Sequence, residues 1–435
     1  MFETLKNAFS TKDIRNKIFY TLIMMFIYRL GCYIPIPGLD STAVTASFNN
    51  DNLFMSILSS VTGGALSNGT IFALGIVPFI NSFIIMQLVT MIIPALERMS
   101  KEGEEGKKKI TQITRVVAIG LAIVQGIGIV MSWKNSNAVT SDQNGGFLPE
   151  WLVMVFIVLI LTGGSSLVMW IGERVTEYGV GNGTSLIIFV GILSTAATAV
   201  INSVDMAIKN QNIGNIWLIL LFLLLLVAIF FCIVFVDSAE RKIMVQYAKQ
   251  VKGNKMYGGQ STHIPIKVNA SGVMPIIFAS AFLMFPQMIT SLFWQNSAFD
   301  LWWRQYMGVG TWTYSIVITA LIFGFSYFYS SIQFDPDDVA KNIQQYGGFL
   351  PGIRPGKPTS DHLRRINNRI TLFGAIFLSL INLIPSIIFK YLGQGMALSN
   401  AFTATGLLIV VSVALEFNKQ LENQLMMRNY KGFLK

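Results

Sequence analysis

The side chains best suited to catalysis or metal binding are few in this sequence, and none is arranged for either task. The two histidines, His263 and His362, lie in polar segments without metal-ligand spacing around them. The two cysteines, Cys32 and Cys232, fall in apolar stretches, where small buried residues are the simplest interpretation and no disulfide framework can be argued. Metalloprotease, phosphate-loop and serine-hydrolase motifs do not occur. The sequence therefore predicts a protein that is not an enzyme and that uses no metal and no cofactor.

Charged side chains inside apolar blocks are the next chemistry to consider, because ion-coupled transporters place such groups on the ion or substrate path. Here Arg29 falls inside an apolar block and has no obvious acidic partner. Glu173, Asp237 and Glu416 lie only at the ends of blocks. This pattern argues against proton or sodium coupling, and it also argues against general acid–base catalysis.

Uncharged polar residues are more frequent in the apolar blocks. They include Asn81, Ser82, Gln87, Gln125 and Asn269. Ordinary interhelical hydrogen bonds, worth about 1 kcal/mol each, explain any one of them. As a set, they also suit an interface between helices whose contacts are weak enough to open and close.

The elements that carry these residues are predicted to be membrane-spanning helices. Of 435 residues, 53% are hydrophobic and only 12% are charged, about half the charged fraction of a soluble domain. The apolar blocks are about 20 residues long, which is the length a helix needs to cross the bilayer. We predict an all-α polytopic membrane protein. Its ten transmembrane helices are expected at residues 18–35, 74–94, 111–132, 151–171, 184–204, 213–236, 269–293, 312–333, 370–391 and 398–417.

The distribution of basic residues predicts the orientation. Of 32 Lys and Arg residues, 27 fall in segments on the N-terminal side of the membrane, which places both termini in the cytoplasm. The net charge of +10 is then concentrated on one face. Attraction to anionic lipids explains part of this charge, and a docking surface for an acidic or nucleic-acid-bearing partner is the alternative. Residues 1–17 are predicted to form an interfacial helix and residues 418–435 a cytoplasmic tail.

Two predicted cytoplasmic loops, 237–268 and 334–369, are too long to be simple connectors. The first has the pattern of a β-hairpin. The second predicts a helix capped at Asp335 with Pro336 in its first turn, followed by a proline-stiffened bend around Arg354. Long basic loops with internal structure are typical of partner-binding elements.

The segment 63–72, GGALSNGTIF, is too short to cross a bilayer and too apolar for an ordinary surface loop. Irregular backbone is tolerated at membrane depth where it lines a water-filled cavity, so we predict that this segment lies in such a cavity. The alternative is a re-entrant external loop that packs for stability.

Eight stretches of the chain resemble the SecY family, the channel subunits of bacterial protein translocases. They are YRLGCYIPIPG (28–38), GGALSNGTIFALGIVPFI (63–80), KEGEEGKKKITQITR (101–115), GVGNGTSLIIFVGI (179–192), VQYAKQ (245–250), QSTHIPIKVNASGVMPIIFA (260–279), GGFLPGIRPGKPT (347–359) and LLIVV (407–411). The resemblance implies two inverted five-helix halves, residues 18–204 and 205–417, around a central pore with a lateral gate. The chain departs from the family pattern at Gln344 and Gln345, positions at which family members often have lysine.

The resemblance also implies a role for particular residues. The pore constriction would be a ring of Ile76, Ile80, Ile188, Ile277 and Ile409. The lateral gate would include Asn81, Ser82, Gln87, Gln125 and Asn269. A displaceable plug would comprise Gly63, Gly64, Ala65, Leu66, Ser67, Asn68, Gly69, Thr70, Ile71 and Phe72, with a hinge at residues 73–75. Docking of a motor or the ribosome would use Arg241, Lys242, Lys249, Lys252, Lys255, Arg354 and Lys357.

The function implied is passage of unfolded secretory proteins across the bacterial plasma membrane and sideways release of membrane-protein helices into lipid. The implied partners are the small subunits SecE and SecG, the SecA motor ATPase, the ribosome, and signal peptides with their nascent chains. A secondary transporter of a small neutral solute is the alternative from another class. A non-conducting scaffold or insertase with the same fold is a third possibility.

Overall fold

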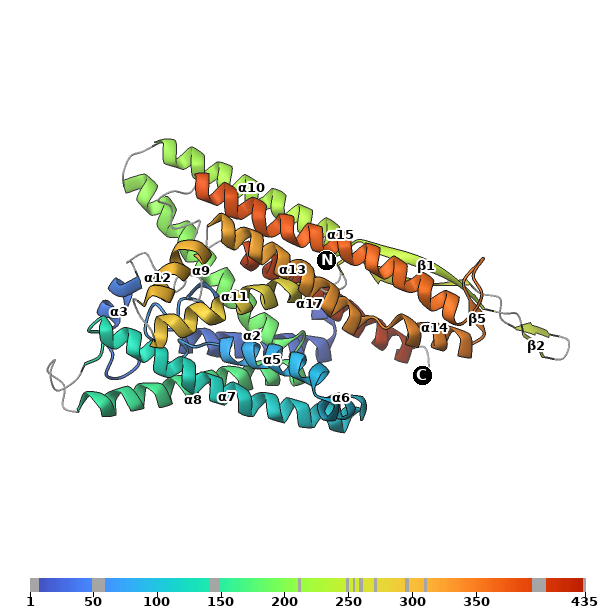
Figure 1. Ribbon diagram of the computed structural model, residues 1–435, viewed down its shortest axis with the longest axis horizontal. Coiled ribbons are helices and arrows are strands. Elements are labelled where there is room, and N and C mark those ends of the chain that lie inside the picture. The colour runs from blue at the N-terminus through green and yellow to red at the C-terminus, as the bar shows by residue number, and fades with distance from the viewer. Residues whose placement is uncertain are drawn as a thin grey trace. The chain divides into compact units, whose positions relative to one another are not determined.

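A helix lies over each of the ten predicted spans in the computed structural model (Figure 1). The structure describes residues 8–48, 59–140, 149–209, 213–247, 250–252, 255–257, 261–269, 272–293, 297–308, 311–392 and 404–432. The ten helices are α2 (Lys12–Gly31), α5 (Val77–Ile92), α7 (Glu104–Asn135), α8 (Glu150–Tyr178), α9 (Gly183–Lys209), α10 (Ile213–Asp237), α11 (Met274–Phe293), α13 (Trp312–Gln333), α15 (Lys357–Leu392) and α17 (Ala404–Gly432). Shorter helices are α3 (Ser41–Phe48), α6 (Pro94–Lys101), α12 (Ala298–Met307) and α14 (Pro336–Gln345).

The helices carry the apolar surface of a membrane protein. In the described part of the chain, six helices are long and apolar enough to cross a membrane, and a seventh is obtained if the bent pair α5 and α6 counts as one span. Large apolar side chains face outward, among them Leu224, Phe231 and Phe235 on α10. The pair α5 and α6 bends by 106° at Ile93, whose extended backbone is what the following Pro94 favours.

The first helix is shifted toward the N-terminus relative to its prediction. It begins at Lys12, so residues 12–17 are continuous with the helix over the first predicted span. Residues 1–7 of the predicted interfacial helix lie outside the described part. The helix ends at Gly31, before the predicted limit at 35. Arg29 is therefore not in mid-span. It lies in the last turn of the helix, where the negative end of the helix dipole favours a cation.

The chain divides into two compact units. Unit 1 contains residues 1–220, 284–309 and 389–435. Within it, α7 packs against α5 and α8, and α8 packs against α2 and α9; Figure 1 shows α7 and α8 side by side. Helix α17 packs on α9 and belongs to unit 1; the two inverted halves implied by the resemblance stay a prediction.

Unit 2, residues 221–283 and 310–388, unites the two long loops in one small sheet. Strand β1 (Glu240–Tyr247) pairs antiparallel with β4 (Ser261–Lys267) on one side and with β5 (Gly348–Phe349) on the other. The β1–β4 hairpin was predicted, but the contribution of the second loop through β5 was not. A separate pair, β2 (Gln250–Lys252) and β3 (Lys255–Tyr257), extends the first loop.

An apolar core holds this sheet to α14 and α15. Val245 of β1 and Leu363 of α15 are completely buried in it. As predicted, Asp335 caps α14, since its carboxylate accepts hydrogen bonds from the backbone N–H groups of Asp337 and Asp338, and Pro336 is in the first turn. The all-α prediction therefore holds for the spans, while the loops form a mixed α/β element, called here the loop module (residues 240–247, 261–267 and 336–370).

Candidate functional site

The segment 63–72, called here the plug segment, contains no helix or extended strand. A chain of turns runs from residue 62 to the start of α5, interrupted only by a single bridge at Thr70. The backbone is left-handed at Gly63 (φ 69°), Gly64 (φ 83°) and Gly69 (φ 61°). Because other residues rarely adopt such φ values, these glycines make the irregular path possible.

The start of the plug segment is bound by the last turn of α2. Arg29 donates a hydrogen bond from Nη1 to the carbonyl oxygen of Gly63 at 3.0 Å. The hydroxyl of Tyr28 donates to the carbonyl oxygen of Thr62 at 3.4 Å. The Arg29 guanidinium also lies 5.4 Å from the ring centroid of Tyr33 and donates to its hydroxyl at 3.2 Å. Arg29, for which the sequence shows no obvious acidic partner, thus binds a backbone carbonyl.

The middle of the plug segment pairs with the chain that follows α2. Pro35 and Thr70 form an antiparallel bridge. The N–H of Ile36 donates to the carbonyl of Gly69, and the N–H of Ile71 donates to the carbonyl of Ile34, both at 3.1 Å. This short main-chain pairing ties the plug segment to the stretch YIPIP.

The end of the plug segment fits against two helices at close range. The ring of Phe72 stacks on Tyr28 with centroids 6.0 Å apart. A Cβ atom added to Gly31 would lie 2.0 Å from the Phe72 ring, and one added to Gly164 of α8 would lie 1.9 Å from the carbonyl oxygen of Ile71. The hydroxyl of Ser165 donates to the carbonyl of Gly75 at 3.1 Å. Small residues on α2 and α8 therefore make the space that this segment occupies.

Apolar side chains of the plug segment are part of the core of unit 1. Ala65 and Leu66 have no exposed surface. Leu66 belongs to a cluster with residues of α7 and α8, including Trp133 and Ile157, and Ile71 packs against it. The described partners of Leu66, Ile71 and Phe72 are on α2, α7 and α8.

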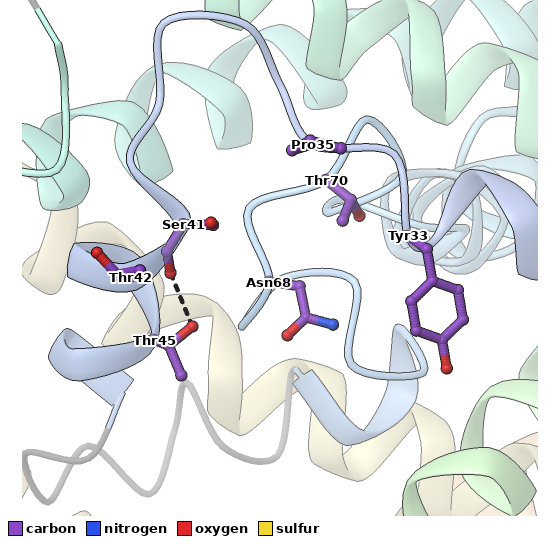
Figure 2. A pocket seen from close by; sticks show the side chains of 7 residues that line it. All are labelled: Tyr33, Pro35, Ser41, Thr42, Thr45, Asn68 and Thr70. Carbon is purple, nitrogen blue, oxygen red and sulfur yellow. Dashed lines mark hydrogen bonds between the residues drawn. The ribbon is translucent and has the colours of Figure 1, made fainter.

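An open pocket of about 610 Å³ lies beside the plug segment. Figure 2 shows Ser41, Thr42 and Thr45 of α3 on one side of it, Tyr33 on the other, and Asn68 and Thr70 of the plug segment between them. The hydroxyl of Thr45 donates to the carbonyls of Ser41 at 2.8 Å and Ser67 at 3.3 Å. The lining residues carry hydroxyl and amide groups but no charge, so they offer hydrogen bonds to water without attracting ions of one sign.

The five isoleucines of the predicted ring lie on four helices. Ile76 caps the N-terminus of α5 and Ile80 follows one turn later, on the same face. Ile76, Ile188 on α9 and Ile409 on α17 are at most 8% exposed, whereas Ile80 and Ile277 are half-buried. Ile277, on α11, belongs to unit 2 and the others to unit 1. Their convergence on one constriction stays a prediction.

The predicted lateral-gate residues have contrasting surroundings. The hydroxyl of Ser82 on α5 donates to the carbonyl of Thr114 on α7 at 2.6 Å, so this residue joins neighbouring helices of unit 1. Asn269 donates to Asp237 at 2.7 Å within unit 2. In the described part of the chain, the buried Oε1 of Gln87 and Nε2 of Gln125 have no hydrogen-bond partner. Asn81 is half-buried.

The predicted docking residues are exposed where the structure describes them. Arg241 and Lys242 lie on β1, and Arg354 and Lys357 flank the turn before α15. The turn is fixed by the hydroxyl of Thr359, which donates to the carbonyl of Arg354 at 2.9 Å. The backbones of Lys252 and Lys255 face each other in the β2–β3 pair, and Lys249 lies outside the described residues.

A polar cluster that the sequence did not predict joins α14 to α15. Asp337 accepts a hydrogen bond from the hydroxyl of Ser360 and pairs with Arg364 at 2.8 Å. The Ser360 hydrogen bond lowers the pKa of Asp337 below its ordinary value, and the charges of Arg364, Lys341 and Lys357 act in the same direction. The opposite charges of the two helices are visible in the sequence, but only the fold shows which residues meet.

Comparison with known proteins gives a consistent result. The SecY family model matches residues 70–418. The protein translocase subunit SecY of Streptomyces galbus is 40% identical over 448 residues, covering 100% of both chains. These matches favour a protein channel over a transporter of small solutes.

Solved structures share the fold. A SecY channel whose plug domain is described as stabilising the closed state and maintaining a membrane seal has a TM-score of 0.66, with 19% identity over 94% of this chain and 91% of that chain. Sec61 in a canine ribosome–channel complex has a TM-score of 0.60, with 18% identity over 94% and 91% of the two chains. With the full-length match to Streptomyces, the chain belongs to the SecY family: it is a protein-conducting channel of the Sec translocase, not an enzyme.

Proposed function

We propose that the plug segment closes the resting channel and that the isoleucine ring forms the seal through which a translocating chain passes. The observation that carries this proposal is an irregular, glycine-bearing segment buried among α2, α7 and α8 and continuous with α5. A segment of this kind at membrane depth suits a pore, since its free backbone groups need protein or water partners. It contains no helix, so it can be displaced without unfolding one.

In this proposal Ile76 and Ile80 begin the ring directly after the hinge at residues 73–75. Aliphatic side chains close around an empty pore and exclude water, which makes a dry barrier for ions. They form no directional bonds, so they also adapt to any passing side chain. Ile188, Ile277 and Ile409 complete the ring.

One amide atom without a hydrogen-bond partner on each of Gln87 and Gln125 supports a role at the lateral gate. A buried amide without a partner costs free energy, and an opening interface that lets in water or a signal peptide relieves this cost. Ser82 and Asn269 anchor the helices on either side in this scheme, and Asn81 faces the same opening. An apolar signal sequence enters here because each Leu, Ile or Phe favours lipid by about 0.3–0.6 kcal/mol at mid-bilayer.

The loop module is proposed to dock the SecA motor or the ribosome on the cytoplasmic side. Both long loops contribute to one sheet and one core, so Arg241, Lys242, Arg354 and Lys357 are displayed by a single rigid element. The homologous Sec61 channel bound to a ribosome supports this assignment. The resemblance adds SecE and SecG as subunits, anionic lipids at the basic face, and a bacterial plasma membrane with both termini in the cytoplasm.

Single-channel recording tests the closing function. A translocase complex whose SecY-family chain lacks residues 63–72 is expected to give large, frequent openings in a planar bilayer. The intact complex is expected to stay closed. The double substitution Ile76→Ser and Ile80→Ser should also leak ions while leaving membrane insertion of the channel unchanged. Absence of conductance from both variants would contradict the proposal.

A further inference from the structure

Arg29 binds the plug segment in a way that the channel function does not require. It is the one charged residue in the apolar stretch 18–35. Among the described residues no carboxylate pairs with it; its guanidinium instead reaches the carbonyl oxygen of Gly63 and the ring and hydroxyl of Tyr33. An uncharged side chain would fill the same space, so packing alone does not require an arginine here.

The geometry at Gly63 is that of a clamp. A Cβ atom on Gly63 would lie 2.7 Å from Nη1 of Arg29 and 3.0 Å from the backbone of Gly191 on α9. One on Gly191 would lie 2.8 Å from the carbonyl oxygen of Val61. The chain entering the plug segment therefore passes between a guanidinium on one helix and a glycine on another. It cannot leave this position while the hydrogen bond to Arg29 is intact.

The support of Arg29 is independent of the plug segment. Tyr33 lies one turn beyond Arg29, accepts from Nη2 at 3.2 Å and lies under the guanidinium at 5.4 Å. The cation–π contact and the negative end of α2 would hold the guanidinium in place after Gly63 departs. The arginine is thus pre-oriented to rebind the same carbonyl when the segment returns.

We propose that Arg29 is the latch of the plug segment: a positioning residue that holds the segment closed through the Gly63 carbonyl and is itself oriented by Tyr33. This inference rests on the proposed closing function of residues 63–72. It explains why the stretch YRLG places tyrosine and arginine together at the end of the first span. The tyrosine before Arg29, Tyr28, holds Thr62 and Phe72 on the same side.

Thiol accessibility measures the latch directly. Thr70 is only 1% exposed, and Thr70→Cys introduces no larger side chain there. In a chain with Cys32→Ala and Cys232→Ala, assembled in the translocase of intact cells, its reaction with a membrane-impermeant maleimide reports movement of the plug segment. A hydrogen bond from a charged group is worth roughly ten- to hundredfold in an equilibrium. Arg29→Gln should therefore increase the labelling rate by about tenfold or more.

Matched variants separate a latch from a general packing defect. Arg29→Lys keeps a charged donor and should label at close to the parent rate, and Tyr33→Phe should cause a smaller increase than Arg29→Gln. Arg15→Gln removes an exposed arginine from the same helix and should leave the rate unchanged. The inference is overturned if Arg29→Gln labels at the parent rate, or if Arg29→Lys labels as fast as Arg29→Gln.

The result is also separable from the proposed function. If the chain lacking 63–72 conducts ions but Arg29→Gln labels no faster, the closing function stands and the latch fails. If that deletion gives no conductance, the closing function fails, whatever the labelling rate. Should Arg29→Gln not accumulate in the membrane, Tyr33→Phe carries the test alone, and a parent labelling rate in that variant overturns the inference.

Discussion

At the scale of single residues, the plug segment fits because several neighbouring helix positions are glycines, which have no side chain. A methyl group on Gly164, Gly31 or Gly191 would collide with backbone or ring atoms of residues 61–72. Protein interiors tolerate even one extra methylene poorly when backbone must move. These glycines were visible in the sequence, but glycine is common in membrane helices, so only the fold distinguishes those that matter.

Adjacent glycines on α8 provide a direct test. Gly164→Ala would place a Cβ 1.9 Å from the Ile71 carbonyl oxygen, whereas the same change at Gly163 meets nothing within 4 Å. Gly164→Ala is expected to displace the plug segment and raise the ion permeability of the closed channel. Gly163→Ala should leave permeability unchanged and stabilise the helix slightly. Ion flux into proteoliposomes measures both, and equal permeability of the two variants would contradict the close fit.

At the scale of elements, hydropathy predicts the positions of the spans because each helix must bury or expose one long apolar surface. The same reasoning placed the end of the first span at residue 35, whereas α2 ends at Gly31, where the chain turns to pair with residues 69–71. It also missed β5, because a two-residue strand has no periodicity to detect. The capped start of α14 was predictable because the signal at Asp335 and Pro336 is local.

The contact between α14 and α15 predicts a pH dependence. The pKa of Asp337 is lowered in the folded chain, so its contribution to stability is complete above the ordinary aspartate pKa of about 3.9 and is lost as the pH falls through the lower folded value. Asp337→Asn should make residues 334–369 more sensitive to protease at pH 7. The difference from the parent should shrink as the pH falls below about 4 and through the lower folded pKa, at which the parent carboxylate becomes protonated.

The neighbouring Asp338→Asn is the control for Asp337→Asn. Asp338 is exposed in the same first helical turn, so both changes remove one favourable interaction with the helix dipole. Limited proteolysis of the two variants at neutral pH should differ, with Asp338→Asn close to the parent. Identical cleavage would show that the pairing with Ser360 and Arg364 does not hold the loop module together.

At the scale of the whole molecule, the segments proposed for sealing and for docking belong to different units. The plug segment and its glycines belong to unit 1, and the loop module belongs to unit 2. The residues predicted for the ring and the lateral gate are distributed over both units. Their roles come from the family resemblance, because nothing in the sequence distinguishes a pore-lining isoleucine from any other isoleucine in a membrane helix. Physical reasoning from the sequence reached the membrane class; the orientation and the partner-binding role of the loops stay predictions.

Docking through the loop module is expected to be selective. Arg354→Glu should impair SecA-driven export of a secretory protein by at least about tenfold, as expected for loss of one charge-assisted contact, and should affect insertion of a membrane protein much less. Arg365→Glu reverses an exposed charge on α15 and serves as the control. An equal loss of both activities in Arg354→Glu would indicate a folding defect in place of a docking role.

The central claim, that chains pass through an isoleucine ring closed by residues 63–72, is tested most directly by crosslinking. Photoreactive residues at Ile188 and Ile277 are predicted to crosslink to a secretory protein arrested in the membrane. The same probes at Leu193 on α9 and Phe282 on α11, which are 50% and 59% exposed, should crosslink to lipid. Arrested chains that crosslink at Leu193 and Phe282 but not at Ile188 and Ile277 would contradict the account.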